Sequence, residues 1–439
     1  MSVKVIGGGL AGCEAAWQLA KRGISVDLYE MKAHQKTPAQ SLDTLAELVC
    51  SNSLRSDRLT NAVGLLKAEM RKLDSLIMRV ADETAVPAGG ALAVDRIGFS
   101  AGIDKVIREH PLITLHEEEI TEIPNEGTVI IATGPLTSDK LSEAINRMPG
   151  LSTLHFYDAA APIVTADSLD MDKIFCMSRY ERGADYLNCP MDKDTYFEFV
   201  HALQTAETVP VRGFEEKAVF EGCMPIESMA KRGDMVIAFG PLKPVGLTDP
   251  RTGKEPFAVV QLRRDNFSGS LYNIVGFQTR LTYPEQRRVF GMIPGLENAE
   301  YARLGVMHRN TFLNSPGFLD DTFRVINQPN VYFAGQITGV EGYVESAASG
   351  LLVGLTVAYR EQDKEPPRFS GRTAIGAMGR YVSTLNKRFQ PMNCAFGLID
   401  PLEVKPGEKR IRNKQQRYEK ISERALAELD MIVEQMDKE

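Results

Sequence analysis

The sequence predicts an α/β protein in which a doubly wound parallel sheet is interrupted by a second, mixed α/β domain. A glycine-rich turn joins an apolar strand to a helix at the N-terminus, and the apolar strand 128–133 ends in Thr-Gly. Another apolar strand near residue 330 is followed by glycines and a helix, which indicates that the first domain resumes there. The intervening chain is richer in aromatic residues and prolines. We expect 1–150 to form the first part of the nucleotide-binding domain, 151–320 the insertion domain, 321–400 the return segment and 401–439 a charged C-terminal helix or tail.

The N-terminal motif is Gly7-Gly8-Gly9-Leu10-Ala11-Gly12, placed between a strand and a helix expected over 13–22. In a GxGxxG motif the first glycine permits a tight turn, the second lets the backbone approach a pyrophosphate, and the third lets the helix pack against the strand. The helix N-terminus favours the phosphate charge. A second strand ends at Glu30, whose carboxylate would accept hydrogen bonds from ribose hydroxyls. The motif and Glu30 therefore predict a dinucleotide site.

The return strand leads into Gly335 and Gln336, followed by more glycines and a helix expected over 344–359. In two-dinucleotide-type flavoproteins, a strand ending in Gly-Asp at this point places backbone N–H groups near the ribityl chain and pyrophosphate of the flavin. Gln336 stands where many such proteins have Asp, and its amide can bond a ribityl hydroxyl without repelling the pyrophosphate. The two motifs together favour a Rossmann-like FAD-binding domain. The sequence holds no second GxGxxG, so we expect a nicotinamide reductant to bind only transiently.

Other segments have simpler periodicities. Residues 32–60 are polar and predict an irregular loop beside the nucleotide site. Apolar residues over 62–81 recur with a helical period and predict one amphipathic helix. A helix is expected over 194–205 within the insertion domain. Residues 402–439 are charged with one apolar helical face, which predicts a surface helix packed on the body, with RNA binding through its basic first half as the alternative.

The composition excludes several classes of protein. The chain has 439 residues, of which 43% are hydrophobic and 25% charged, values typical of a soluble globular enzyme. No apolar run approaches the roughly 20 residues of a membrane span. The six cysteines are scattered without metal-binding spacing, which predicts a cytoplasmic protein with reduced thiols and no metal site.

The formal net charge of −7 argues only weakly against a polyanionic partner, because binding depends on local patches. Basic residues gather in three stretches, which are either docking surfaces or ordinary solvated faces. They comprise Arg280, Arg287, Arg288, Arg303, His308 and Arg309; then Arg368, Arg372, Arg380, Lys387 and Arg388; and finally the run from Lys405 to Arg424.

Two cysteines stand in segments that suggest chemistry. Cys50 lies in the polar loop that follows the first βαβ unit, and Cys223 lies in a turn bounded by glycine and proline. A cysteine with an ordinary pKa of about 8.5 is mostly protonated at neutral pH, so a nucleophilic role needs a cationic neighbour. Arg55 or Arg58 could serve Cys50 in this way. The alternative is that both are inert small hydrophobic residues.

Seven long, irregular motifs spread over nearly the whole chain resemble those of one family, the bacterial folate- and FAD-dependent tRNA uracil-5-methyltransferases. A larger flavoprotein family that modifies the tRNA wobble uridine shares the N-terminal motif and the Ala-Gly-Gln strand end, but this chain is shorter and carries the methyltransferase motifs. These motifs are Glu47–Ser56, Ser178–Gly183, Tyr186–Met191, Phe220–Glu227, Phe239–Leu247, Tyr272–Thr279 and Val306–Thr311.

The resemblance implies methylation of C5 of the T-loop uridine, uridine 54, of tRNA. The family takes its carbon from 5,10-methylenetetrahydrofolate and its reducing equivalents from FADH2, which NAD(P)H regenerates, and the methylene is expected to travel on flavin N5. The resemblance also implies catalytic roles for Cys50 and Cys223. We assign Cys223 as the thiolate that adds to uracil C6 and Cys50 as its partner on the flavin side, although the sequence does not decide between them.

Some alternatives remain open at the level of sequence. These alternatives are an FAD-dependent oxidoreductase, a wobble-uridine-modifying flavoprotein, a dUMP methylase and an RNA-binding flavoprotein. Glu341 and Tyr343 are candidates for folate contacts, or simply residues of a turn and a helix start. The expected partners are the T-arm of tRNA and folate, without a membrane, and the chain is expected to be a monomer or a dimer.

Overall fold

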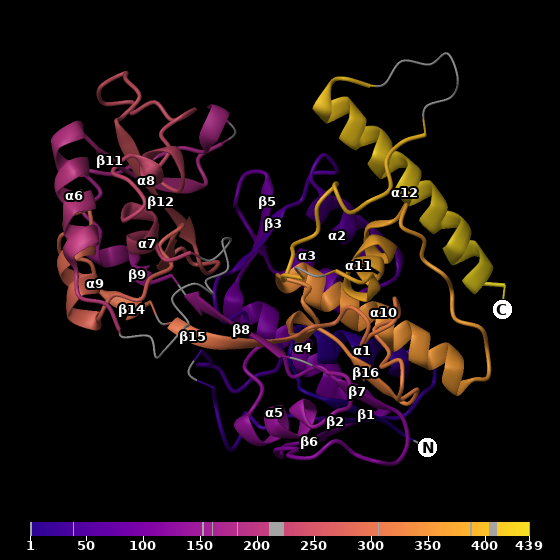
Figure 1. Cartoon of the computed structure of the whole chain (residues 1–439). Coiled ribbons are helices and arrows are strands. Elements are labelled where there is room, and N and C mark those ends of the chain that lie inside the picture. The colour runs from indigo at the N-terminus through magenta and orange to yellow at the C-terminus, as the bar shows by residue number, and fades with distance from the viewer. Residues whose placement is uncertain are drawn as a thin grey trace.

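The computed structural model describes residues 2–37, 39–151, 153–159, 161–181, 183–209, 224–305, 307–386, 389–403 and 411–438; for 153–159, 181 and 307–310 only the backbone is described. The described chain forms a larger lobe, which contains both termini, and a smaller lobe (Figure 1). A long antiparallel ribbon of β8 (Thr153–Ala159) and β15 (Met307–Leu313) runs between the lobes. Where one domain ends and the next begins stays a prediction.

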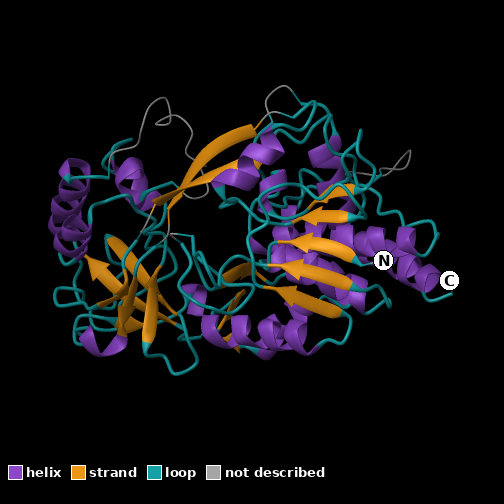
Figure 2. Cartoon of the chain, turned by 90° about the horizontal axis from the view of Figure 1, so that it is seen from below, coloured by secondary structure: helices purple, strands orange, loops and turns teal. Residues whose placement is uncertain are grey.

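The larger lobe is built on a parallel sheet of five short strands in the order β16-β7-β1-β2-β6, seen side by side in Figure 2. All neighbouring pairs are parallel and most side chains in the sheet are buried, as expected for a sheet with helices on both faces. The predicted fold class is confirmed. The strands are β1 (Val3–Ile6), β2 (Val26–Tyr29), β6 (Ile113–His116), β7 (Val129–Ile131) and β16 (Val331–Phe333).

Two helices pack together beside this sheet because small residues let them approach closely. They are α1 (Leu10–Ala20) and α10 (Tyr343–Glu361), near the expected positions. A Cβ added to Gly350 of α10 would lie 2.2 Å from the Ala11 carbonyl oxygen, and one on Gly354 would lie 2.7 Å from that of Ala15. The return segment is thereby held against the N-terminal glycine motif.

The expectation of one helix over 62–81 is wrong. The segment forms α2 (Ala62–Lys72) and α3 (Leu76–Glu83), with Asp74 between them at a φ of 55°. Ser75 caps α3, and its hydroxyl donates to the buried carboxylate of Glu14 on α1. Both halves keep their apolar faces buried, so the hydrophobic period did not reveal the break.

The predicted loop over 32–60 is only partly irregular. It contains β3 (Ser53–Ser56), which pairs with β5 (Ala91–Val94) in a small antiparallel sheet completed by β4 (Ala85–Val86). The remaining helices of this lobe are α4 (Arg96–Glu109), α5 (Asp139–Asn146), α11 (Ala374–Ser383) and α12 (Lys414–Met436).

The smaller lobe contains a six-stranded sheet in the order β10-β11-β12-β13-β9-β14, whose neighbouring pairs are antiparallel. Its apolar side chains form a core with the helices of this lobe, while alternate residues of β11, β12 and β13 are polar. The elements are β9 (Ile163–Thr165), β10 (Phe175–Cys176), β11 (Tyr186–Met191), α6 (Lys193–Thr205), α7 (Ile226–Ala230), α8 (Val236–Phe239), β12 (Ala258–Arg264), β13 (Leu271–Ile274), α9 (Tyr283–Phe290) and β14 (Tyr301–Arg303).

The C-terminal segment ends in a helix that packs on the larger lobe, as the sequence predicts. Tyr418 of α12 stacks on Phe396 with ring centroids 4.0 Å apart, and Ser422 donates to the Leu59 carbonyl. Among the described residues, no helix is both long and apolar enough to cross a bilayer.

Candidate functional site

A cavity of about 460 Å³ lies where the two lobes meet. The larger lobe contributes the β1–α1 turn, the end of β2, the loop after β7 and the turn before α10, and the smaller lobe contributes residues of β12 and β13. The loop that carries Cys50 also lines it. Residues from both expected flavin motifs, among them Gly9, Glu30, Gly335 and Gln336, therefore face the same space.

The glycines of the N-terminal motif differ in what surrounds them. Gly7 has a φ of 105° and packs so closely on the sheet that a Cβ would lie 2.6 Å from the Ala132 carbonyl oxygen. A Cβ on Gly12 would lie 1.8 Å from the Gly7 carbonyl oxygen, as expected for the helix-packing glycine. A Cβ on Gly9 would meet no atom within 4 Å. Open space above the start of α1 fits a bound pyrophosphate.

Gly7, Gly9, Leu10 and Ala11 all line this space. Gly8 instead packs against Leu45 and donates its N–H to Glu30 Oε2 at 2.7 Å. Glu30 Oε1 accepts from the N–H of Lys32 at 2.9 Å, so the carboxylate is fixed at the cavity edge. This position suits the predicted contact with ribose hydroxyls.

The return motif is held by two side-chain contacts. The N–H of Gly335, whose φ is 87°, donates to Ser349 Oγ at 2.7 Å. Gln336 Nε2 donates to both carboxylate oxygens of Glu341, at 2.7 and 2.9 Å. An Asp at position 336 would repel Glu341, which gives a physical reason for the amide here.

The backbone of the Cys50 loop is anchored from both lobes. Tyr343 Oη accepts hydrogen bonds from the N–H groups of Cys50 at 2.6 Å and Ser51 at 3.2 Å. Burial raises the pKa of Tyr343, so its phenol stays protonated. Arg303, at the end of β14, donates to the carbonyls of Val49 and Cys50.

Three arginines surround this loop, of which Arg96 and Arg263 are buried and Arg303 is half-buried. Arg96 donates to the Leu48 carbonyl and Arg263 to Ser51 Oγ, in addition to the contacts of Arg303. A thiolate at Cys50 interacts favourably with all three guanidinium groups. Such a cationic setting is the kind that activates a cysteine.

The sequence suggested Arg55 or Arg58 for this role, and the structure places Arg55 differently, in an ion pair with Glu345. The three arginines that do surround the loop were missed. They lie far from Cys50 in the chain, so only the fold brings them together.

Comparisons with known proteins agree with this geometry. A family model described as glucose inhibited division protein A, GidA, matches residues 2–365. Methylenetetrahydrofolate–tRNA-(uracil-5-)-methyltransferase TrmFO of Lactobacillus johnsonii is 58% identical over 436 residues, covering 99% of this chain and 98% of its own, and TrmFO of Listeria innocua is 58% identical over 437 residues, covering 99% of both. The chain belongs to the TrmFO family, within the GidA-like flavoproteins.

The structure of Aquifex aeolicus GidA shares the fold of this chain. Its TM-score is 0.69 at 17% sequence identity, and the match covers all of this chain and 76% of that one. Membership of the TrmFO family confirms the resemblance seen in the motifs.

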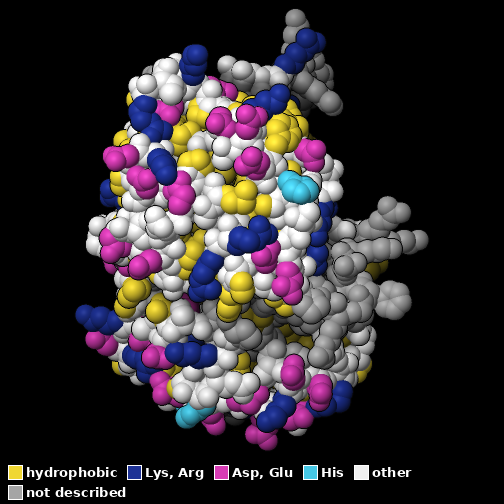
Figure 3. Space-filling model, turned by 90° about the vertical axis from the view of Figure 1, so that its left-hand side faces the viewer, with side chains coloured by type: hydrophobic (Ala, Val, Ile, Leu, Met, Phe, Trp, Pro, Cys, Tyr) yellow, Lys and Arg dark blue, Asp and Glu magenta, His cyan; other side chains and the backbone are white. Residues whose placement is uncertain are grey.

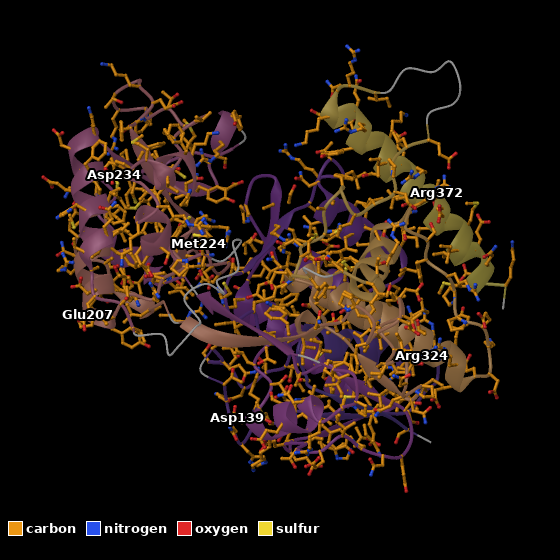
Figure 4. All side chains as sticks on the ribbon, in the orientation of Figure 1. Asp139, Glu207, Met224, Asp234, Arg324 and Arg372 are labelled. Carbon is orange, nitrogen blue, oxygen red and sulfur yellow. The ribbon has the colours of Figure 1, made fainter. Side chains whose placement is uncertain are left out.

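Cys223, the second expected cysteine of the TrmFO family, lies outside the described residues. Met224, the next residue, is buried and lies on the side of the smaller lobe that faces the larger one (Figure 4). The N–H of Ile226 donates to the carbonyl of Gln278 at 2.8 Å, and Gln278 lines the cavity. The chain that follows Cys223 is therefore bonded to a residue of the cavity wall contributed by the smaller lobe.

The two folate candidates, Glu341 and Tyr343, both line the cavity. Glu341 is bonded to Gln336, and the Tyr343 hydroxyl to the Cys50 loop. Their described contacts are thus with protein groups that shape the site, and a folate contact stays a prediction.

Among the described residues of the three basic stretches, some are paired or partly buried and others are exposed. Arg303 is mostly buried at the Cys50 loop, and Arg288 pairs with Glu285 at 2.6 Å. Arg380 of the second stretch pairs with Asp400, and Arg372 with Glu428. In the third stretch, Arg412, Lys414 and Arg417 are exposed around the start of α12, on the side facing the smaller lobe (Figure 1).

Proposed function

We propose that this chain methylates C5 of the T-loop uridine, uridine 54, of tRNA. The carbon would come from 5,10-methylenetetrahydrofolate, and FADH2 regenerated by NAD(P)H would act as reductant. Full-length identity of 58% to TrmFO methyltransferases carries this proposal. The convergence of both flavin motifs and the Cys50 loop on one cavity supports it.

FAD would be held by the N-terminal motif, by Glu30 and by the return motif. Its pyrophosphate would lie over Gly9 at the start of α1, its ribose against Glu30, and its ribityl chain near Gly335 and Gln336. When bound, it would supply the reducing equivalents and carry the one-carbon unit. Gly8 and Gly12 contribute indirectly, through Glu30 and through helix packing.

The two cysteines would share the remaining chemistry. Uracil C5 is a poor nucleophile until a donor adds to C6, so one thiolate must attack first. We assign this attack to Cys223 and the flavin-side role to Cys50, whose loop accepts hydrogen bonds from Arg263 and Arg303. The cationic surroundings of Cys50 support a thiolate in that position.

The tRNA would dock where the two lobes face each other. Exposed cations lie at the start of α12, on the side of the larger lobe that faces the smaller lobe. The outer face of the smaller lobe shows acidic and basic side chains intermixed rather than a basic surface (Figure 3). We place the enzyme in the cytoplasm with its substrate.

Formation of labelled ribothymidine in an unmodified tRNA transcript, from labelled methylenetetrahydrofolate and NADPH, tests the proposal. We expect label in the transcript and none in free dUMP. Cys223→Ser is expected to abolish transfer and to retain FAD, and Cys176→Ser, which changes an exposed thiol outside the cavity lining, serves as control. A yellow, folded enzyme that transfers no carbon to the transcript would refute this function.

A further inference from the structure

The cavity wall from the smaller lobe carries two polar side chains that the flavin motifs leave unexplained. Arg263 on β12 and Asn273 on β13 are register partners in the antiparallel ladder, so both leave the same face of the sheet. Both line the cavity, and they are only 7% and 3% exposed. They form a buried polar pair at the edge of the space expected for substrate.

Asn273 has a hydrogen-bond donor to spare. Its Nδ2 is buried and bonds to no other described residue. Burying an amide N–H without an acceptor is costly and rare. Because this side chain lines a cavity, the missing acceptor is most simply supplied by a ligand.

Arg263 is a buried cation held by neutral groups. Its Nε donates to Asn52 Oδ1 at 3.0 Å and its Nη2 to Ser51 Oγ at 2.7 Å. The guanidinium carries five N–H donors, more than these two contacts require. Burial lowers the pKa of Arg263, which reflects the cost of keeping its charge away from water. Negative charge developing on a ligand beside it would be stabilised strongly.

We propose that Arg263 and Asn273 bind the O4 carbonyl of the target uracil and stabilise the enolate that forms there. This inference rests on the proposed function. Attack by the cysteine thiolate forms the S–C6 bond and moves the C5=C6 electron pair toward O4, so that no atom is oxidised or reduced. When C5 attacks the methylene donor, the same electron pair forms the new carbon–carbon bond and the O4 carbonyl is restored.

The position of the pair favours uracil over the other ligands of the cavity. Arg263 bonds to Ser51, the neighbour of Cys50, while the chain after Cys223 bonds to Gln278 on the same wall. The wall that carries the pair is thus bonded to the Cys50 loop at Ser51 and, through Gln278, to the described chain that begins at Met224. The sulfur that attacks C6 and the donors that hold O4 must reach one and the same ring. Cytosine carries an amino donor in place of O4, so the pair also explains a preference for uridine.

Asn273→Asp is the main test, because it replaces the spare donor by an acceptor and breaks no described bond of Nδ2. Arg263→Lys keeps the charge but removes the planar fork. Arg264→Gln is the matched control, since Arg264 is the next residue on β12 and its side chain leaves the opposite face. The readout is the rate of covalent complex formation with a 5-fluorouridine tRNA transcript, followed on a denaturing gel.

We expect complex formation to be about 100-fold slower in Asn273→Asp and Arg263→Lys and unchanged in Arg264→Gln. FAD content and NADPH-dependent flavin reduction without tRNA should stay at the wild-type level. Equal rates in wild type and Asn273→Asp would overturn the inference. Loss of the flavin response to methylenetetrahydrofolate in these variants, measured without tRNA, would also overturn the inference, since Arg263 and Asn273 would then bind folate. A wild-type enzyme that forms no complex would count against the proposed function itself.

Discussion

Arg96 and Asp265 form a buried ion pair between the two lobes, with Nε–Oδ2 and Nη2–Oδ1 distances of 3.0 and 2.8 Å. Burial acts to lower the pKa of Arg96, but the charge of Asp265 outweighs it and the pKa is raised. The same guanidinium donates to the Leu48 carbonyl, two residues before Cys50. One contact therefore fixes both the smaller lobe and the cysteine loop against α4.

Arg96→Met should destabilise the folded chain by about 3–5 kcal/mol, because it leaves the Asp265 carboxylate buried without its partner. Chemical denaturation of the FAD-bound enzyme measures this loss. Arg108→Met on the same helix is the control. Arg108 itself and its partner Glu117 are exposed, so we expect less than about 1 kcal/mol. Similar effects of the two changes would mean that the lobe contact is not held by this pair.

Glu69 makes stability depend on pH. Its fully buried carboxylate accepts from the N–H groups of Ala374 and Ile375 at the start of α11. Burial raises the pKa of Glu69 to about 7, against an ordinary value of 4.5. Between these values the folded chain holds more protons than the unfolded chain, so the free energy of unfolding falls as pH rises. The full effect is about 3 kcal/mol, present below pH 4.5 and lost above pH 7.

Glu69→Gln should remove this part of the pH dependence. Denaturant titrations at pH 5, 6 and 7.5 would show a flatter profile in the variant than in wild type. Glu83→Gln, on the exposed face of α3, should keep the wild-type slope. If Glu69→Gln keeps it too, the carboxylate is ionised throughout and the assignment of the titrating group is wrong.

Much of the larger lobe could be predicted because its signals are local. The turn at Gly7, the close packing at Gly12 and the position of Glu30 directly after β2 each follow from a short stretch of sequence. The return strand was predictable for the same reason. The break at Asp74 was not, because a residue with positive φ between two apolar helical faces leaves the hydrophobic period almost unchanged.

The surroundings of Cys50 could not be predicted, since they are assembled from distant segments. Arg96, Arg263 and Arg303 reach the loop from α4, β12 and β14, and only the packing of the lobes brings them together. Arg303 was grouped with exposed basic residues because sequence alone carries no signal for its burial. Polar residues alternating with apolar ones on β12 could have suggested a ligand-facing sheet.

The glycines of the N-terminal motif should respond differently to alanine. In Gly12→Ala the new methyl would collide with the Gly7 carbonyl, so we expect a lower melting temperature and loss of FAD. In Gly9→Ala the methyl enters open space, so the apoenzyme should melt within about 2 °C of wild type. FAD affinity should still fall at least about 10-fold, because the methyl occupies the approach of the pyrophosphate. Apoenzyme melting and FAD titration separate the two effects, and normal FAD affinity in Gly9→Ala would place the pyrophosphate elsewhere.

Tyr343→Phe tests whether the shape of the Cys50 loop matters for catalysis. The change removes the acceptor for the N–H groups of Cys50 and Ser51, which costs about 1–3 kcal/mol for each group left buried without a partner. Because the ring itself remains, FAD binding should change little, while the rate of methyl transfer should fall at least about 10-fold. Tyr381→Phe is the control, since its hydroxyl bonds to the Gln390 carbonyl on the surface. A wild-type transfer rate in Tyr343→Phe would mean that Arg96, Arg263 and Arg303 suffice to hold the loop.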